Sequence, residues 1–298
     1  MRLSRRDFLK LASAFGITAT VPLEWISKAL AGNGLPPVIW LQGLSCSGCS
    51  ISLLNSVNLA TIDDVLLNKI DLDYHSTLIA AAGDVVFSDM ARQGYILVVE
   101  GSIPWNANGK YCYVGSNLTM FGAFNRFSAA AQQIVAVGTC ASFGGVAKAN
   151  PNPTGTHSVA ETLTALGRNK PLINIPGCPI HPDWFVGTLL SLLAGETVIL
   201  DSQKRPQVYF GRTVHSRCPF RESEEANAVG QAGCLEEVGC KGPITYANCP
   251  ILKWNNPGPS TTGVNWCAQA RTPCHGCTEP GFPDSMVPFI RLGEGDDD

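Results

Sequence analysis

The sequence has neither the excess of basic residues nor the long apolar segments that mark several common protein classes. Its 298 residues carry 21 lysines and arginines against 24 aspartates and glutamates, which gives a net charge of −3. Nucleic-acid binders usually present a basic face, so this balance argues against that class. No run beyond the N-terminal region approaches the roughly 20 apolar residues that span a bilayer, and we therefore expect no transmembrane anchor.

The sequence also lacks the motifs and the cysteine density of two other classes. The turn at residues 139–145, Thr-Cys-Ala-Ser-Phe-Gly-Gly, could cradle a phosphate, but it has neither a Gly-x-Gly-x-x-Gly motif nor a P-loop lysine. Twelve cysteines are many for an ordinary enzyme, yet a small disulfide scaffold would contain more than about 8–10% cysteine. A 45% share of apolar residues is enough for a sizeable core.

The N-terminal residues have the pattern of an export signal. Arg5 and Arg6 precede a weakly apolar segment, which ends in Ala29-Leu30-Ala31. This order predicts a twin-arginine signal peptide over residues 1–31 with cleavage after Ala31, although an amphipathic helix is the alternative. Twin-arginine export moves folded proteins, often with their cofactors loaded. We therefore expect a periplasmic protein whose cysteines bind metal rather than form disulfides.

Apolar runs alternate with helical patterns through the first two thirds of the chain. This alternation predicts a parallel sheet with helices on both faces. The expected strands are residues 36–43, 72–80, 94–101, 132–140 and 170–178. The expected helices are residues 50–58, 61–70, 83–92, 117–129 and 157–167.

Four cysteines follow strands of this predicted sheet. Cys46 and Cys49 come after the first strand, Cys140 ends the fourth and Cys178 ends the fifth. The Cys-x-x-Cys spacing alone fits a redox dithiol, half of a zinc site or half of an iron–sulfur site. Because ligands bind at the carboxyl ends of parallel strands, we expect the four thiols to converge there. Four thiolates suit a cubane cluster or zinc.

Regular periodicity fades after about residue 205, and seven of the other eight cysteines lie there. A region with little hydrophobic core needs cross-links to stay folded, and metal clusters would supply them. Zinc accepts the same ligand types, so spacing alone leaves both kinds of site open. The two groups of four candidate ligands are His215, Cys218, Cys234 and Cys240, then Cys249, Cys267, Cys274 and Cys277.

Several motifs in one order resemble the small subunit of periplasmic nickel–iron hydrogenases, closest in pattern to the nickel–iron–selenium branch. They are the twin-arginine leader, VIWLQGLSCSGC, LVVEGSIP, VGTCASFGG, PGCPIHPDW, HSRCPF, GCKGPITYANCP and PCHGC. The resemblance implies an α/β fold, with a flavodoxin-like, doubly wound parallel sheet in residues 32–204. It also implies an irregular, cluster-stapled C-terminal domain in residues 205–298.

The resemblance also implies three iron–sulfur clusters and their ligands. The proximal 4Fe-4S cluster would use Cys46, Cys49, Cys140 and Cys178. The distal 4Fe-4S cluster would use His215, Cys218, Cys234 and Cys240. The medial cluster would use Cys249, Cys267, Cys274 and Cys277.

The medial site departs from the commonest family pattern. Many relatives have proline where this chain has Cys267, and their medial cluster keeps three irons. A fourth thiolate can hold a fourth iron, so we expect a 4Fe-4S cluster; without ligation by Cys267 it would be 3Fe-4S. Cys112 is left over and is interpreted as a buried free thiol. Glu100 could hydrogen-bond at the proximal site, cap a helix or reach a partner subunit.

The implied function is electron transfer in a heterodimer. We find no nucleophile, base or nickel ligand set in the sequence, so we expect no catalytic residue in this chain. A separate large subunit would hold the nickel–iron centre, where the selenium branch carries selenocysteine. The expected external carrier is a c-type cytochrome. The alternatives are a non-catalytic electron-transfer or hydrogen-sensing subunit, and an exported zinc or disulfide protein.

Overall fold

A parallel sheet forms the centre of the N-terminal region in this computed structural model, which describes residues 35–78 and 94–286. The strand order is β2-β1-β3-β7-β9, and every pairing within it is parallel. This is the flavodoxin-like order, so the predicted fold class and the five predicted strands are confirmed. The strands are β1 (Pro37–Gln42), β2 (Asp71–His75), β3 (Ile96–Glu100), β7 (Gln133–Val137) and β9 (Leu172–Ile175).

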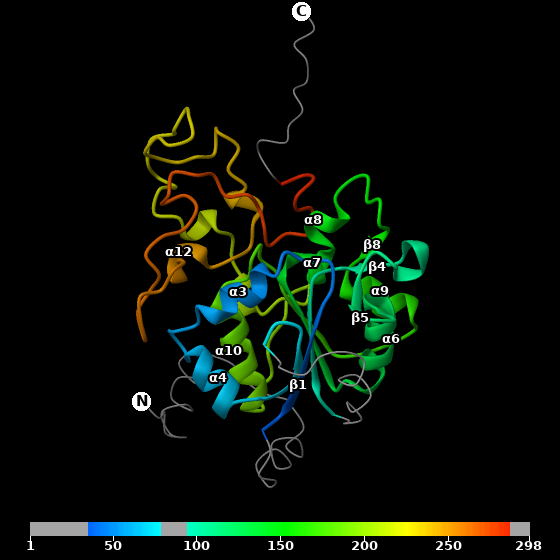
Figure 1. Cartoon of the computed structure of the whole chain (residues 1–298). Coiled ribbons are helices and arrows are strands. Elements are labelled where there is room, and N and C mark those ends of the chain that lie inside the picture. Colours follow the sequence, from blue (N-terminus) through cyan, green and yellow to red (C-terminus); the bar gives the residue numbers. More distant parts are fainter. Residues whose placement is uncertain (1–34, 79–93, 287–298) are drawn as a thin grey trace, which may run out of the picture.

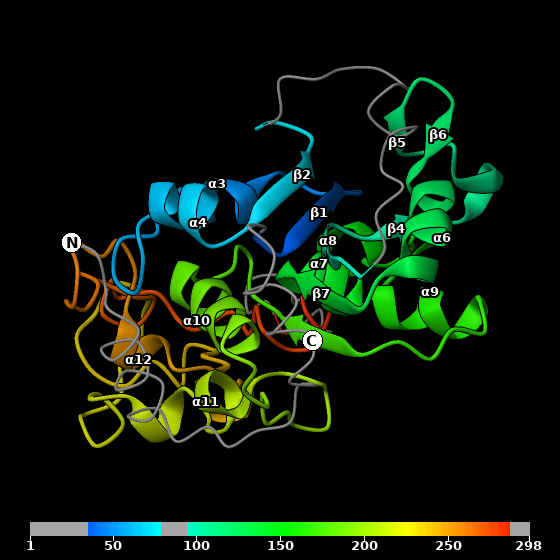
Figure 2. The same ribbon diagram turned by 90° about the horizontal axis from the view of Figure 1, so that it is seen from below.

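Helices cover both faces of the sheet because its strands are apolar on both sides. Val38, Trp40, Ile96 and Val98 belong to one buried cluster, whereas their sequence neighbours belong to the other. Figure 2 shows the two helical layers on opposite sides of the sheet. One layer contains α3 (Gly48–Leu54), α4 (Ile62–Asn68) and α10 (Pro182–Leu193), and the other contains α6 (Met120–Ala130) and α9 (Val159–Ala165).

The starts of these helices follow from local sequence. Thr119 caps α6 by accepting a hydrogen bond from the N–H of Gly122, and α9 begins with a capping box between Ser158 and Glu161. Four of the predicted helices are confirmed, while the predicted helix at 83–92 lies outside the described residues. The prediction missed α10, which has Pro182 in its first turn.

Short elements complete the N-terminal region. Helices α7 (Gly138–Phe143) and α8 (Gly145–Lys148) follow β7. A 3₁₀ helix, η1, spans Asn106–Gly109. Two small antiparallel pairs join β4 (Ile103–Pro104) to β8 (Thr156–His157) and β5 (Tyr113–Gly115) to β6 (Leu118–Thr119).

The chain from residue 205 onward is irregular, as predicted. Its described part contains only one-turn helices: α11 (Gln207–Phe210), η2 (His215–Arg217), η3 (Gly242–Ile244) and α12 (Cys249–Leu252). This region, coloured yellow to red in Figure 1, lies beside α3 and α7 at one end of the sheet. Across residues 35–78 and 94–286, every helix is too short or too polar to cross a membrane. The boundary between residues 204 and 205 stays a prediction.

Candidate metal centres

The four predicted proximal ligands come together at the carboxyl ends of the strands. Cys46 precedes α3, Cys49 lies in its first turn, Cys140 lies in α7, and Cys178 follows β9. Burial raises the pKa of Cys49, and nearby Glu100, Cys140 and Cys178 raise it further. Burial and then Cys178 raise the pKa of Cys140 to about 11, with a smaller contribution from Cys46. The four sulfurs therefore lie within electrostatic reach of one another.

Glycines let the backbone approach these sulfurs closely. A Cβ atom at Gly138 would lie 2.5 Å from Cys49 Sγ, and one at Gly145 would lie 2.8 Å from Cys140 Sγ. Both glycines have positive φ angles, 84° and 55°, which other residues adopt only with strain. The backbone N–H of Val146 hydrogen-bonds Cys140 and lowers its pKa. Backbone donors around thiolates are typical surroundings of iron–sulfur clusters.

Glu100, at the end of β3, anchors the loop that carries Cys49. The residue is 1% exposed, and its Oε1 accepts hydrogen bonds from the N–H groups of Cys49 (3.1 Å) and Ser50 (3.2 Å). Its Oε2 accepts from Trp40 Nε1 at 3.1 Å and from the Ser50 hydroxyl. Of the roles that the sequence left open, Glu100 both caps α3 and hydrogen-bonds at the proximal site.

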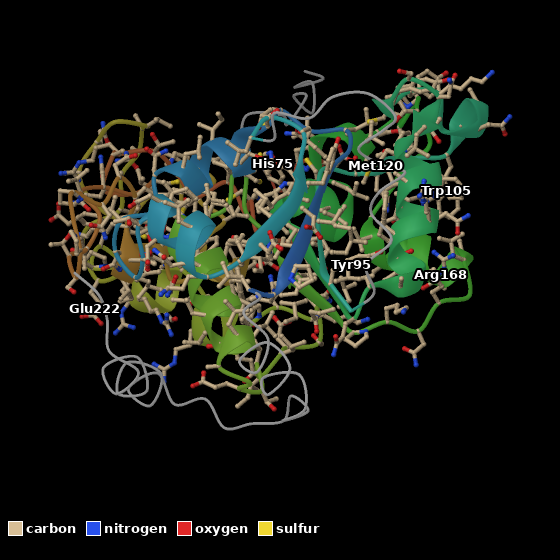
Figure 3. All side chains as sticks on the ribbon, turned by 60° about the horizontal axis from the view of Figure 1, so that its bottom comes forward. His75, Tyr95, Trp105, Met120, Arg168 and Glu222 are labelled. Atoms are coloured by element: carbon tan, nitrogen blue, oxygen red, sulfur yellow. The ribbon has the colours of Figure 1, made fainter. Side chains whose placement is uncertain are left out.

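A neutral histidine completes this buried network. The Ser50 hydroxyl lies 3.1 Å from His75 Nε2, and burial lowers the pKa of His75 to about 4. Figure 3 labels His75, which ends β2. His75 is buried, and its contacts with Ser50 make it part of the structure that supports α3.

The four predicted medial ligands line one cavity. Cys249 begins α12, and it shares a cavity of about 610 Å³ with Cys267, Cys274 and Cys277. Burial is the largest cause that raises the pKa of Cys249. The nearby Cys277, Cys274 and Cys267 raise it further, in that order. The structure thus brings Cys267 to the other three. The side chain of Trp254 hydrogen-bonds Cys249 and acts in the opposite direction, lowering its pKa.

The predicted distal ligands also converge. Atoms of His215, Cys234 and the exposed Glu236 that could bind a metal all lie within 4.8 Å of one another. Burial raises the pKa of Cys218, and Cys240 and Cys234 contribute to that shift. Glu236 Oε2 lies 3.8 Å from His215 Nδ1. Sequence reasoning missed Glu236, whose only signal is its position two residues after Cys234.

The donor chemistry of the three sets fits metal centres. Thiolate is the metal-binding form of cysteine, but burial and nearby negative charge raise the pKa values of Cys49, Cys249 and Cys218, one thiol from each set. A positive centre among the sulfurs would offset both effects. The residues present therefore fit iron–sulfur clusters in two sets of four thiols and one set of three thiols with an imidazole. All twelve cysteines carry free thiols in the structure.

The remaining candidates lie apart from the three sets. Cys112 packs in the hydrophobic cluster on the other face of the sheet and is half-buried rather than buried. Burial raises its pKa to about 11. His157 stacks on Trp105 with ring centroids 3.7 Å apart, and the buried His181 contacts the backbone oxygen of Lys253.

Comparisons with known proteins agree with this arrangement. Residues 46–192 match the family described as NADH ubiquinone oxidoreductase, 20 Kd subunit, and residues 210–290 match the C-terminal family of the NiFe/NiFeSe hydrogenase small subunit. The periplasmic [NiFeSe] hydrogenase small subunit of Desulfomicrobium baculatum is 39% identical over 97% of this chain and 99% of its own length. The periplasmic [NiFe] hydrogenase small subunit 1 of Nitratidesulfovibrio vulgaris is 39% identical over 97% and 93%.

Solved structures give the same result. The recombinant [NiFeSe] hydrogenase from Desulfovibrio vulgaris Hildenborough has a chain with a TM-score of 0.79 and 42% identity, covering 87% of this chain and 98% of its own. The fold and the thiol-rich sites define an oxidoreductase subunit of the nickel–iron hydrogenase class. The chain belongs to the NiFe/NiFeSe hydrogenase small-subunit family.

Proposed function

We propose that this chain carries electrons between a nickel–iron centre on a separate large subunit and an external carrier. The complex would catalyse H₂ = 2 H⁺ + 2 e⁻ through that partner, and three 4Fe-4S clusters would be bound here. The observation that carries the proposal is the convergence of twelve candidate ligand residues into three sets of four. When bound, the clusters would supply one-electron oxidation and reduction, which thiol and imidazole side chains do not provide by themselves.

Each ligand set has a distinct place in the proposed relay. Cys46, Cys49, Cys140 and Cys178 would hold the proximal cluster, and Cys249, Cys267, Cys274 and Cys277 the medial one. His215, Cys218, Cys234 and Cys240 would hold the distal cluster. Cys178 lines the cavity that contains the medial ligands, which supports direct proximity of the first two sets.

The surface around the proximal set suits a large partner protein. Cys46 and Cys178 are exposed in the chain alone. The side chains of Ile51 and Val146, on helices that carry or follow the proximal ligands, are also exposed, at 59% and 57%. Apolar side chains beside exposed thiols favour coverage by another protein. We infer that the large subunit covers this face. We also infer that the metal centre of the large subunit resembles that of the nickel–iron–selenium branch.

The surface around the distal set suits a basic electron carrier. Exposed glutamates surround its ligand loops, and Figure 3 places Glu222 at the opposite edge of the molecule from Arg168. Acidic side chains steer basic partners to a docking site and favour fast association. A c-type cytochrome is the proposed carrier. The exposed glutamates are Glu222, Glu224, Glu225, Glu236 and Glu237.

The proposal is tested by metal analysis of the purified complex. The heterodimer is expected to contain about twelve irons in this chain, because three cubane clusters hold four each. It should consume hydrogen with a cytochrome as acceptor, while the isolated chain should consume none. Zinc in place of iron, or hydrogen consumption by the isolated chain, would contradict the proposal.

Export is a second expected outcome. Residues 1–31 lie outside the described residues, and the proposal of a twin-arginine signal rests on Arg5 and Arg6 together with the periplasmic location of the two relatives named above. Replacing both arginines by lysine should leave the iron-loaded protein in the cytoplasm. Cell fractionation followed by immunoblotting measures this, and normal periplasmic activity of the double variant would refute the export route.

A further inference from the structure

The ligand loops of neighbouring sets hydrogen-bond to one another. The backbone N–H of Cys178, a proximal ligand, faces the sulfur of the medial ligand Cys277 and lowers the pKa of that thiol. The backbone N–H of the medial ligand Cys274 donates to the sulfur of the distal ligand Cys240 over 3.2 Å. The N–H of Lys241 also donates to the carbonyl of Cys274 at 2.8 Å. Contacts between ligand loops therefore connect the proximal set to the medial set and the medial set to the distal set.

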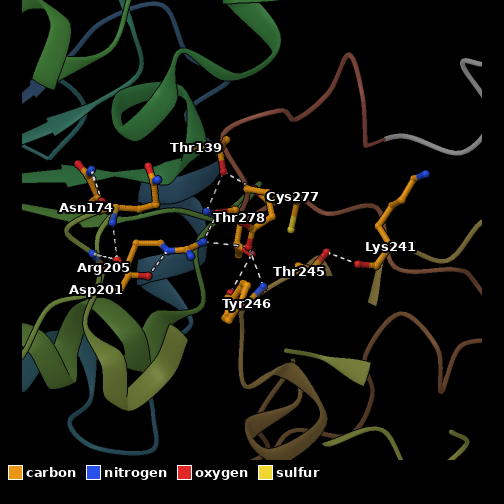
Figure 4. Close-up of polar contacts among 12 residues, drawn as sticks. Thr139, Asn174, Asp201, Arg205, Lys241, Thr245, Tyr246, Cys277 and Thr278 are labelled. Atoms are coloured by element: carbon orange, nitrogen blue, oxygen red, sulfur yellow. Dashed lines mark hydrogen bonds and ion pairs between the residues drawn. The ribbon is translucent and has the colours of Figure 1, made fainter. Parts of the chain in front are cut away.

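One side chain lies at the first of these junctions. Thr139 is 1% exposed and directly precedes Cys140. Its hydroxyl donates to the carbonyl of Cys277 and accepts a hydrogen bond of 2.9 Å from the N–H of Gly177. Its own N–H donates to the carbonyl of Gly177 at 3.0 Å. Figure 4 shows the Thr139 hydroxyl beside Cys277.

This hydroxyl, on the loop of Cys140, thus contacts two other ligand loops at once. Gly177 precedes Cys178, so the Thr139 contacts fix the peptide segment whose next amide faces the Cys277 sulfur. A valine at this position would have the same shape but could neither donate nor accept a hydrogen bond. The carbonyl of Cys277 and the N–H of Gly177 would then lose their partner.

We propose that Thr139 is a positioning residue that holds the proximal ligand loops against the medial ligand Cys277. The inference rests on the proposed function, since it assumes that these cysteines bind clusters. Hydrogen bonds to cluster sulfurs favour the more negative, reduced state and so raise the reduction potential. Loss of the Thr139 hydroxyl should let the Cys178 loop and Cys277 move apart, so that the backbone donors near the Cys277 sulfur withdraw and the potential of the medial cluster falls.

The test is the Thr139→Val variant of the complete heterodimer. Its iron content should match the wild type, and a redox titration followed by electron paramagnetic resonance should give a lower medial potential. Hydrogen-dependent reduction of the external carrier should fall by about 10-fold, as when residues supporting metal ligands are removed. Exchange of deuterium gas with water, which needs no external acceptor, should fall less than carrier reduction does.

Two further variants make the result specific. Thr139→Ser keeps the hydroxyl and should restore the medial potential and the carrier-reduction rate. Thr162 is a matched control, because it is fully buried in α9 and its hydroxyl donates to the carbonyl of Ser158 at 2.8 Å. Thr162→Val should leave the medial potential unchanged.

The possible outcomes separate the two proposals. A wild-type complex without iron would refute the proposed function itself. An iron-loaded wild type whose medial potential is unaffected by Thr139→Val would refute only the role of Thr139. Cluster loss in Thr139→Val but not in Thr139→Ser would support that role, because the serine variant retains the hydroxyl. Cluster loss in both variants would overturn it, because the serine variant keeps the hydroxyl and loses the cluster all the same.

Discussion

Replacement of Cys267 by proline is expected to turn the proposed medial 4Fe-4S cluster into a three-iron cluster. The thiolate of Cys267 would be the fourth ligand in the cavity that also contains Cys249, Cys274 and Cys277. Proline offers no ligand atom, so the corner of the cubane at this position would lose its iron. Electron paramagnetic resonance of the oxidised protein should show a sharp three-iron signal in the variant and none in the native protein.

The loop before Cys267 is long but well anchored. The segment from residue 255 to 263 separates Trp254 from Val264, yet these two residues pair: Val264 N donates to Trp254 O at 2.8 Å. Trp254 N donates to Asn265 O at 2.6 Å, and the side chain of Trp266 is 4% exposed. The closure entropy of a loop grows slowly with its length, so these contacts are sufficient to bring Cys267 to the cavity.

Two controls isolate the effect of the thiolate. Cys267→Ser removes the sulfur without the backbone restriction of proline, and it should also weaken retention of the fourth iron. Cys112→Ser removes a cysteine that lies outside the three sets, so its spectrum should equal that of the native protein. A strong three-iron signal from undamaged native protein would show that Cys267 is not a ligand.

The strands and the convergence of the thiols could be predicted because both follow from short-range patterns and a general rule of topology. Continuous apolar runs such as residues 96–99 are buried on both faces of a parallel sheet. Ligands bind at the carboxyl ends of such strands, which brings Cys46, Cys140 and Cys178 together although they are far apart in sequence. Helix α10 was missed because its nearly continuous apolar sequence has no clear helical period.

The roles of buried polar groups could not be predicted, because they depend on contacts between distant residues. Glu100 caps a helix 51 residues earlier in the chain, and the sequence left several roles open for it. Arg205 bonds to Glu279, 74 residues later, and neither residue belongs to a recognisable motif. Hydrogen-bond partners at such separations are set by tertiary packing, which no local pattern encodes.

The substitution Arg205→Met is expected to cause a larger loss of stability than any other substitution proposed for this chain. The side chain is 3% exposed and joins the two regions of the chain. Its Nε donates to Asp201 Oδ2 at 2.8 Å, and its Nη1 donates to Glu279 Oε1 at 2.9 Å and to the carbonyl of Thr278 at 3.0 Å. The guanidinium also lies over the rings of Phe210 and Tyr246 (Figure 4 shows Tyr246).

Methionine would fill much of the space but would leave the carboxylate of Glu279 buried without a cation. Breaking a buried ion pair in this way costs about 3–5 kcal/mol. Because Thr278 follows Cys277, we also expect earlier release of the medial cluster. The measurement is the urea midpoint of the heterodimer, followed by circular dichroism and by the visible absorbance of the clusters.

Arg221 provides the matched control for this prediction. It pairs with Glu222 at 2.7 Å, but the two side chains are 46% and 79% exposed. An exposed pair contributes about 0–1 kcal/mol, so Arg221→Met should leave the urea midpoint nearly unchanged. Adding Glu279→Gln to Arg205→Met should recover part of the loss, because the uncompensated charge is then removed. Equal midpoints for Arg205→Met and Arg221→Met would show that the buried network does not hold the cluster-binding region against the sheet.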